Sequence, residues 1–173
     1  MPPGNRLIEL LPHDPSWLVE AGVAIAEIEV ACAAVLRVEH IGSTSIPELR
    51  AKPTIDLMPI VPSFESGFAC VGPMQDLGYE YRGEAGIAGR HYFKMKGSKS
   101  RNVHMFARDN ENMKRHLRFR DYLRAHADAR REYEALKLGL AKEFVSNTHA
   151  YADAKTEFCK KIDARAKLEN MRG

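Results

Sequence analysis

Apolar residues recur at helical spacing near the start of the chain and again throughout its last third. The first series follows the capping pair Asp14-Pro15 and predicts a helix over residues 15–34. Four further segments with this spacing predict helices over residues 64–77, 111–125, 128–144 and 149–168. Asp128 and Asn147-Thr148 are expected to cap the last two helices. Gly67, Gly72 and Pro73 weaken the helix expected over 64–77.

Between these helices the spacing of apolar residues becomes that of strands. Short apolar or alternating runs predict strands over residues 35–41, 54–61, 79–81, 91–95 and 102–107. His104 and Phe106 are expected on one face of the last strand, and Val103 and Met105 on the other. The polar runs 42–45 and 96–100 predict turns, and 83–89 predicts a mobile loop. Strands followed by a helical C-terminal third predict an α+β fold, with helices covering the sheet.

Length and composition agree with a single domain over residues 1–173. The hydrophobic share of 45% and the charged share of 28% match a globular protein and exclude a disordered one. Cys32, Cys70 and Cys159 are odd in number and widely spaced, so we expect reduced thiols and neither a disulfide framework nor a zinc site. The chain opens without an apolar leader, and acids interrupt its most apolar stretch, 19–36. These features predict a cytoplasmic protein that does not span a membrane.

Positive charge is concentrated in one segment, although the net charge is only +3. Residues 112–131 hold seven basic side chains against two acids. Such helical arginines ordinarily form solvated or ion-paired faces. His116, Arg120 and Arg124 nevertheless share one helical face, which could meet a triphosphate or an RNA backbone. Of the functional hypotheses that the sequence supports, RNA binding is the weakest.

The chemistry centres on the segment between His40 and Asp56. A strand ends in Gly42-Ser43, and Asp56 is a lone acid within an otherwise apolar strand. Glycine lets a backbone approach a phosphate closely, and the hydroxyls of Ser43, Thr44 and Ser45 supply donors. Asp56 would hold Mg²⁺, and Lys52 would add a point charge. The alternative is an ordinary turn beside a hydrogen-bonded structural acid, and spacing alone does not decide between them.

Two runs in this region resemble the signature of the GrpB family. They are Val-Glu-His-Ile-Gly-Ser-Thr-Ser-Ile-Pro over 38–47 and Ala-Lys-Pro-Thr-Ile-Asp-Leu over 51–57. The resemblance continues through 89–90, 93–94, 102–105 and 116–124 to Tyr151, Lys155 and Phe158, so it covers nearly the whole chain. It implies a mixed sheet of the polymerase β-type nucleotidyltransferase fold, flanked by helices. In that fold a Gly-Ser turn positions nucleotide phosphates and a strand carboxylate binds the metal. Related domains occur fused to dephospho-CoA kinase.

The resemblance also suggests roles for residues outside the two runs. It places His104 near the carboxylate strand, where it would orient the acceptor or act as a base, although a lone strand histidine is more often simply packed. Arg90, and after it Lys94, become candidate phosphate partners, with Arg90 neutralising developing charge. Lys155 and Tyr151 become candidate ligand contacts, whereas His40 is expected to brace the turn.

Two departures from the family pattern bear on the reaction. An active nucleotidyltransferase usually carries Asp-x-Asp, but the second position here is Met58, whose thioether does not replace a carboxylate. Glu48 stands where the family more often has glycine after proline. Two functions therefore remain open. One is Mg²⁺-dependent nucleotidyl or phosphoryl transfer, and the other is a regulatory module that binds a nucleotide or small molecule without metal-dependent catalysis.

Overall fold

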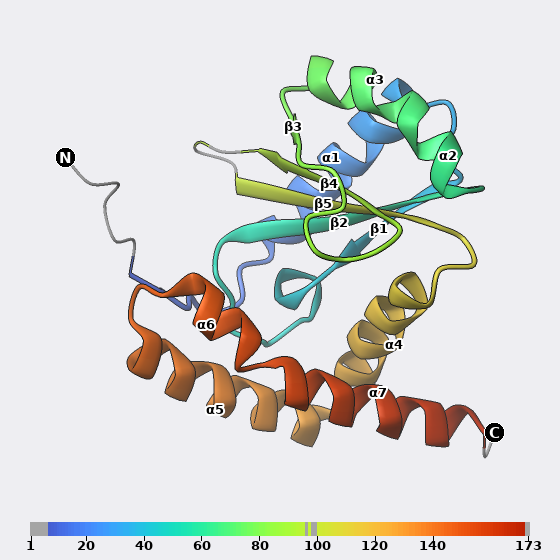
Figure 1. Ribbon diagram of the computed structural model, residues 1–173. Coiled ribbons are helices and arrows are strands. Elements are labelled where there is room, and N and C mark those ends of the chain that lie inside the picture. The colour runs from blue at the N-terminus through green and yellow to red at the C-terminus, as the bar shows by residue number, and fades with distance from the viewer. Residues whose placement is uncertain (1–6, 96, 98–99, 172–173) are drawn as a thin grey trace.

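A five-stranded mixed sheet forms the centre of the computed structural model, which describes residues 7–95, 97 and 100–171 (Figure 1). The strands are β1 (Arg37–Ile41), β2 (Thr54–Val61), β3 (Glu80–Tyr81), β4 (Arg90–Met95) and β5 (Ser100–Ala107). Their order is β1-β2-β5-β4-β3. β2 and β5 run parallel, and the other neighbouring pairs are antiparallel. The α+β class and the mixed sheet expected from the sequence are confirmed.

One face of the sheet is covered by α1 (Ser16–Ala31), α2 (Phe64–Gly67) and α3 (Val71–Asp76) (Figure 1). Trp17, Ala24 and Ile28 of α1 share a core with alternate residues of β2 and β5. The helix expected over 64–77 is instead three short pieces, with a 3-10 turn over Phe68–Cys70 between α2 and α3. Proline has no N–H to continue the helical ladder through position 73. At position 67 a Cβ would lie 2.6 Å from the His91 ring, so glycine is needed for this close approach.

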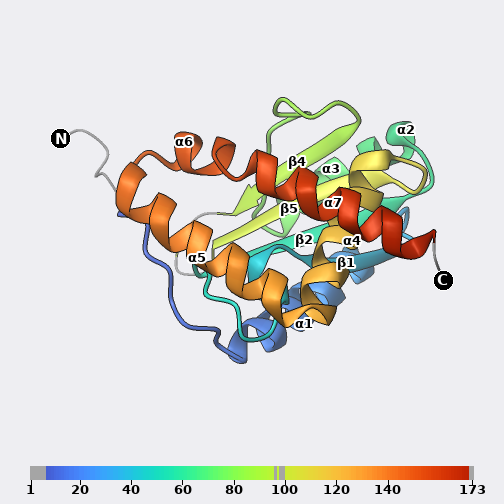
Figure 2. The same cartoon turned by 90° about the horizontal axis from the view of Figure 1, so that it is seen from below.

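The opposite face carries the helical third of the chain. It comprises α4 (Glu111–Ala125), α5 (Ala127–Phe144), α6 (Thr148–Asp153) and α7 (Thr156–Asn170) (Figures 1 and 2). Met58, Ile60 and Phe106 of the sheet pack against Met113 of α4. A second apolar cluster joins these helices to Ile46 and Leu49, in the loop between β1 and β2. The helical third therefore covers both the sheet and this loop.

Two expectations about these helices were wrong. Asp128 lies within the first turn of α5, because the helix begins one residue earlier and His126 occupies the cap position. The helix expected over 149–168 is broken at Ala154-Lys155, giving α6 and α7. The break allows α6 to pack against α5 while α7 packs against α4. The expected cap at Asn147 is confirmed, since its side chain accepts a hydrogen bond from the Ala150 N–H at 3.1 Å.

The remaining expectations concern cysteines, a turn and membrane spans. All three cysteines are free, as expected, with Cys32 and Cys70 buried. The turn expected over 96–100 lies largely outside the described residues, which omit 96, 98 and 99. Across the part of the chain that the structure describes, no helix combines the length and apolar character needed to cross a membrane.

Candidate functional site

Asp56 lies on the face of the sheet that the helical third covers. Because side chains alternate along a strand, it shares this face with Met58 and Ile60 of β2, whereas Ile55 and Leu57 face α1. Asp56 pairs with Asn102 on β5, and Asn102 pairs with Lys94 on β4, so the three residues form one row across neighbouring strands. The Asp56 side chain is 26% exposed, which leaves the carboxylate reachable by a ligand.

The Gly42 turn lies directly against this carboxylate. Gly42 has φ +73°, a conformation that favours glycine, and a Cβ there would lie 2.5 Å from Oδ2 of Asp56. Ser43–Ser45 form a short 3-10 turn immediately after it. Sequence reasoning placed the turn and the acid in one site, and the structure brings them into contact.

Two side chains from β5 hold the other carboxylate oxygen of Asp56. The Asn102 amide donates to Oδ1 at 3.0 Å, and Nε2 of His104 lies 3.5 Å from the same oxygen. The other His104 nitrogen, Nδ1, lies 3.1 Å from the Arg90 guanidinium. A guanidinium only donates, so Nδ1 must accept and the ring proton sits on Nε2, facing Asp56. In this arrangement His104 is a donor that orients the carboxylate, while its role as a base stays a prediction.

The electrostatics of the site favour an ionised Asp56. Burial alone would raise the pKa of Asp56, but hydrogen bonds from His104 and Asn102 and the positive charge of Lys155 outweigh it and hold this pKa below its usual value. The carboxylate is thus charged at neutral pH, with Oδ2 on the side of the Gly42 turn.

Arg90 is buried and committed to partners within the protein. Its guanidinium donates to the carbonyls of Glu84 and Ala85, at 3.1 and 2.8 Å, and stacks on the Tyr92 ring. It thereby joins the 83–89 loop to His104. A direct role for Arg90 at a ligand phosphate, and the mobility of this loop, remain predictions.

Lys52 and Lys155 meet at one aromatic ring. Each ammonium lies 4.5 Å from the centroid of Tyr151, which is buried. Burial lowers the pKa of Lys52, as does the nearby charge of Lys155. Burial also lowers the pKa of Lys155, and the charge of Asp56 partly opposes this shift. Lys155 lies at the break between α6 and α7. Lys52 and Lys155, which are far apart in the sequence, both place positive charge near the Asp56 carboxylate.

Lys137 of α5 is a functional candidate that sequence reasoning missed. Its side chain is 1% exposed, and its ammonium donates to Oγ of Ser43 at 3.1 Å and to the Arg50 carbonyl. The signal was present in the helical pattern, because Lys137 falls on the same face as Tyr133, Leu140 and Phe144. A lysine at a core position of an amphipathic helix is unusual and indicates a buried polar contact.

The hydroxyls that follow Ser43 are used inside the protein. His40 Nε2 lies 2.9 Å from Oγ1 of Thr44, and burial lowers the pKa of His40 to about 4. The Ser45 hydroxyl donates to the Gly42 carbonyl at 2.6 Å. His40 therefore braces the turn, as expected, and Ser43 is the hydroxyl of the turn that lies beside an ammonium group.

The basic segment contributes mainly to internal contacts. Arg120 pairs with Glu39 at 2.7 Å, and Arg124 donates twice to the Ser45 carbonyl, at 3.0 and 2.8 Å. Arg118 pairs with Asp163 at 2.6 Å. His116 is turned toward His104, and burial lowers its pKa to about 3. His116 and Arg120 are thus partly buried, and Arg120 and Arg124, although Arg124 stays exposed, donate to backbone carbonyls at the turn and support it.

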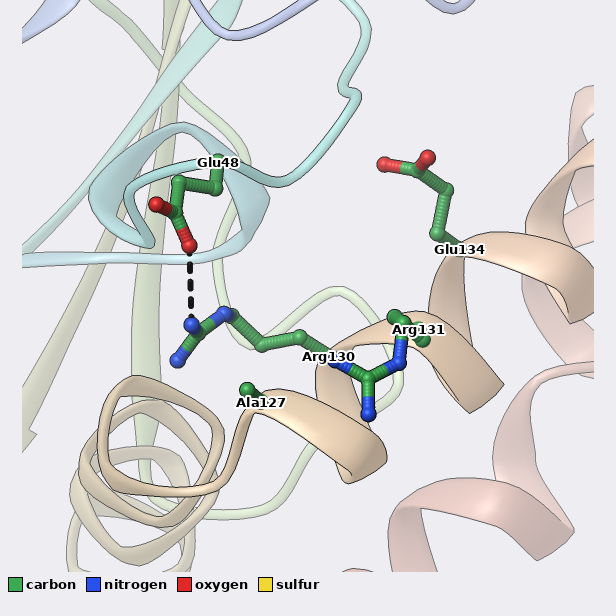
Figure 3. A pocket seen from close by; sticks show the side chains of 5 residues that line it. All are labelled: Glu48, Ala127, Arg130, Arg131 and Glu134. Atoms are coloured by element: carbon green, nitrogen blue, oxygen red, sulfur yellow. Dashed lines mark hydrogen bonds and ion pairs between the residues drawn. The ribbon is translucent and has the colours of Figure 1, made fainter.

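A hollow of about 230 Å³ lies between Glu48, in the loop from β1 to β2, and the first turns of α5 (Figure 3). Arg130 reaches from α5 to Glu48 at 2.9 Å, and Arg131 and Glu134 line the same hollow. Glu48 has φ +65° after Pro47, where glycine would be unstrained. The backbone conformation at this position therefore favours glycine over glutamate.

Met58 and the acids around it bear on metal binding. Met58 is fully buried among Ile41, Ile60 and Phe106, so the position of the usual second carboxylate is part of the core. Within the described residues, no three His, Cys, Asp or Glu side chains converge as a metal site. Mg²⁺ commonly uses one protein carboxylate with phosphate oxygens and water. Asp56 fits such an ion when a bound phosphate completes the ligand set.

Comparison with known proteins identifies the family. The family model described as "GrpB protein" matches residues 7–165. The chain belongs to the GrpB family. Its relatives include UPF0157 protein YqkA of Bacillus subtilis, 42% identical over 77% of this chain, and UPF0157 protein PA4798 of Pseudomonas aeruginosa, 35% identical over 92%. The aligned region spans 39% of YqkA and 67% of PA4798. A dephospho-CoA kinase of Mycobacterium tuberculosis is 27% identical over 84% of this chain and 42% of its own.

Solved structures agree with the family and the fold. Conserved protein GrpB from Enterococcus faecalis superposes with a TM-score of 0.84 at 35% identity, over 94% of this chain and 99% of that one. The Cid1 poly(U) polymerase with MgGTP bound matches with a TM-score of 0.52 at 12% identity, over 77% of this chain and 43% of Cid1. The GrpB-family chain therefore has a fold of the nucleotidyltransferase type.

Proposed function

We propose that this GrpB-family protein binds a nucleotide or another phosphorylated metabolite at the Gly42-Ser43 turn and transfers a nucleotidyl or phosphoryl group, with one Mg²⁺ on Asp56. The observation that carries this proposal is the convergence of an ionised carboxylate, a glycine turn in contact with it, and the charges of Lys52 and Lys155. Such a set suits a phosphate chain with its counter-ion. The fold of Cid1, a polymerase with MgGTP bound, supports the same ligand class.

Each residue has a distinct part in this proposal. Gly42 allows close approach, the Ser43 hydroxyl donates to phosphate, and Thr44 and Ser45 hold the shape of the turn. Lys52 and Lys155 neutralise phosphate charge. His104 keeps the Asp56 carboxylate turned toward the ion, and Arg90 fixes His104. Mg²⁺, when bound, would offset negative charge on the transferring phosphoryl group.

Met58 favours a second candidate, a regulatory module that binds the same ligands without catalysis. Because Met58 is packed in the core, Asp56 alone is left to anchor metal in this motif. Two-metal catalysis requires more oxygen ligands than that. Both candidates bind the same class of ligand. They differ in whether the protein also binds Mg²⁺ and turns the ligand over.

A thermal-shift screen separates the two candidates. Nucleotides, coenzyme A precursors and sugar phosphates would be tested with and without Mg²⁺ on the wild type, Asp56→Ala and the exposed control Asp76→Ala. A ligand at 100 times its Kd stabilises the fold by about 2.7 kcal/mol. A Mg²⁺-dependent hit that Asp56→Ala loses, followed by turnover, supports the transferase. A hit indifferent to both supports the module, and no hit in any class contradicts the site.

A further inference from the structure

Lys137 is a buried cation without an acidic partner at ion-pair distance among the described residues. Its ammonium contacts Oγ of Ser43 at 3.1 Å and the Arg50 carbonyl, and it lies 4.9 Å from the centroid of the Tyr133 ring. All three contacts are to neutral groups. An ammonium removed from water in this way is costly unless an opposite charge compensates it.

The charged groups around Lys137 supply only part of that compensation. On its own helix, the charge of Glu134 favours the ammonium, but the Glu134 carboxylate lies beyond ion-pair distance and accepts a hydrogen bond from the Arg50 N–H at 2.8 Å. At the start of α7, Lys155 adds a second positive charge. The loop offers Ser43 and the backbone of Arg50. Gly42 and Ser43 are only half-buried, so an anion bound at their exposed atoms would add the missing counter-charge.

We propose that Lys137 is the positioning residue of the phosphate turn: from beneath the turn it holds the Ser43 hydroxyl and the Arg50 carbonyl, and an anion bound at the turn completes its charge pairing. Since Lys137 donates to Ser43 Oγ, the serine keeps its own proton to donate, either to the neighbouring Tyr133 hydroxyl or to a bound anion. This inference rests on the proposed phosphate site and adds a residue that acts on the ligand through Ser43. It predicts that anion binding and protonation of Lys137 are linked.

The sign of this linkage follows from burial. Burial, together with the charge of Lys155, lowers the pKa of Lys137 to about 7, although the charge of Glu134 opposes this shift. Below that pH, Lys137 is already protonated in the free protein, and its charge strengthens anion binding. Above that pH, anion binding requires Lys137 to take up a proton, so the affinity falls as pH rises.

The test is isothermal titration calorimetry of the full chain with inorganic tripolyphosphate, at about pH 6 and about pH 9. The variants are Lys137→Met and Lys137→Gln, the second of which keeps a donor but loses the charge. The matched control is Lys142→Met, on an exposed position of the same helix. At the lower pH we expect both Lys137 variants to bind about tenfold more weakly than the wild type, with the gap closing at the higher pH. The control should match the wild type throughout.

Other outcomes would overturn the inference at different levels. Equal affinity of the wild type and both Lys137 variants at both pH values rejects the role of Lys137 and leaves the phosphate site standing. Weakening that is the same at both pH values assigns Lys137 a structural role only. Failure of the wild type to bind tripolyphosphate rejects the phosphate site itself. If Lys137→Met does not fold, Lys137→Gln carries the comparison, because it can still donate to the Arg50 carbonyl.

Discussion

Gly42 and Asp56 are in such close contact that a Cβ at position 42 would come within 2.5 Å of Oδ2. Gly42→Ala must therefore move the Asp56 carboxylate and also hold an alanine at φ +73°. We expect a loss of about 1–3 kcal/mol in unfolding free energy, together with weaker ligand binding at Asp56. Chemical denaturation measures the first effect and calorimetry the second.

The matched control for this substitution is Gly22→Ala, in α1. A Cβ there would meet nothing within 4 Å, and alanine favours a helix over glycine by about 1 kcal/mol. Gly22→Ala should therefore stabilise the fold and leave binding unchanged. If Gly42→Ala behaved in the same way, the contact between the turn and the carboxylate would not matter to the site.

His104→Ala should raise the pKa of Asp56, because it removes one of the two hydrogen bonds that hold the carboxylate ionised. In the wild type, the lowered pKa of Asp56 adds stability above its ordinary value of 3.8, and this is lost as pH falls through the folded value. The variant should lose part of this stability at neutral pH. A carbon-13 NMR titration of the Asp56 carboxyl measures the shift.

His149→Ala is the control for the histidine experiment, since His149 is exposed on α6. It should leave the Asp56 titration where it is in the wild type. An unchanged Asp56 pKa in His104→Ala would show that Asn102 and Lys155 alone keep the carboxylate charged, and that His104 has another use.

Glu48→Gly should stabilise the protein. Glu48 has φ +65°, and relief of this strain gains about 1 kcal/mol. The exposed pair with Arg130 contributes less than that. Glu48→Ala separates the two effects, because it removes the pair and keeps the strain. Thermal unfolding should rank the proteins Gly above wild type above Ala, and a destabilised Gly variant would contradict the strain argument.

Met58→Asp should not simply restore a second metal ligand. The side chain is fully buried among Ile41, Ile60, Phe106 and Met113. A carboxyl group placed there must be buried unpaired or carry a strongly raised pKa. We expect destabilisation of about 3 kcal/mol or more, measured by urea unfolding. Met58→Leu keeps the apolar volume and should cost less than about 1.5 kcal/mol.

Much of the fold was visible in the sequence because its signals are local. Alternation in β5 placed His104 and Phe106 on one face, and the helical spacing marked α1, α4 and α5. The Gly42 turn and Asp56 were visible as a polar turn at a strand end and a lone acid in an apolar strand, and the family resemblance then favoured a common site. The break at Lys155 was not visible, because no proline or glycine marks it and packing against two different helices produces it.

The contacts that set charge and tautomer depend on residues far apart in the chain. Lys137 is 94 positions from Ser43, and no local sequence pattern at either residue predicts their hydrogen bond. Likewise the guanidinium of Arg90 fixes the His104 tautomer across two strands. Arg120 and Arg124 were correctly placed on one helical face, but only the structure shows that this face supports the turn.

Four residues that follow the segment between β1 and β2 by about half the length of the chain help to hold it. Arg124 holds Ser45, Arg130 reaches Glu48, Glu134 accepts from Arg50, and Lys137 contacts Ser43. During synthesis from the N-terminus, the sheet strands leave the ribosome well before these helices do. The nascent chain can therefore form its strands early, but the turn that carries the proposed ligand site becomes ordered only when α5 has emerged and docked.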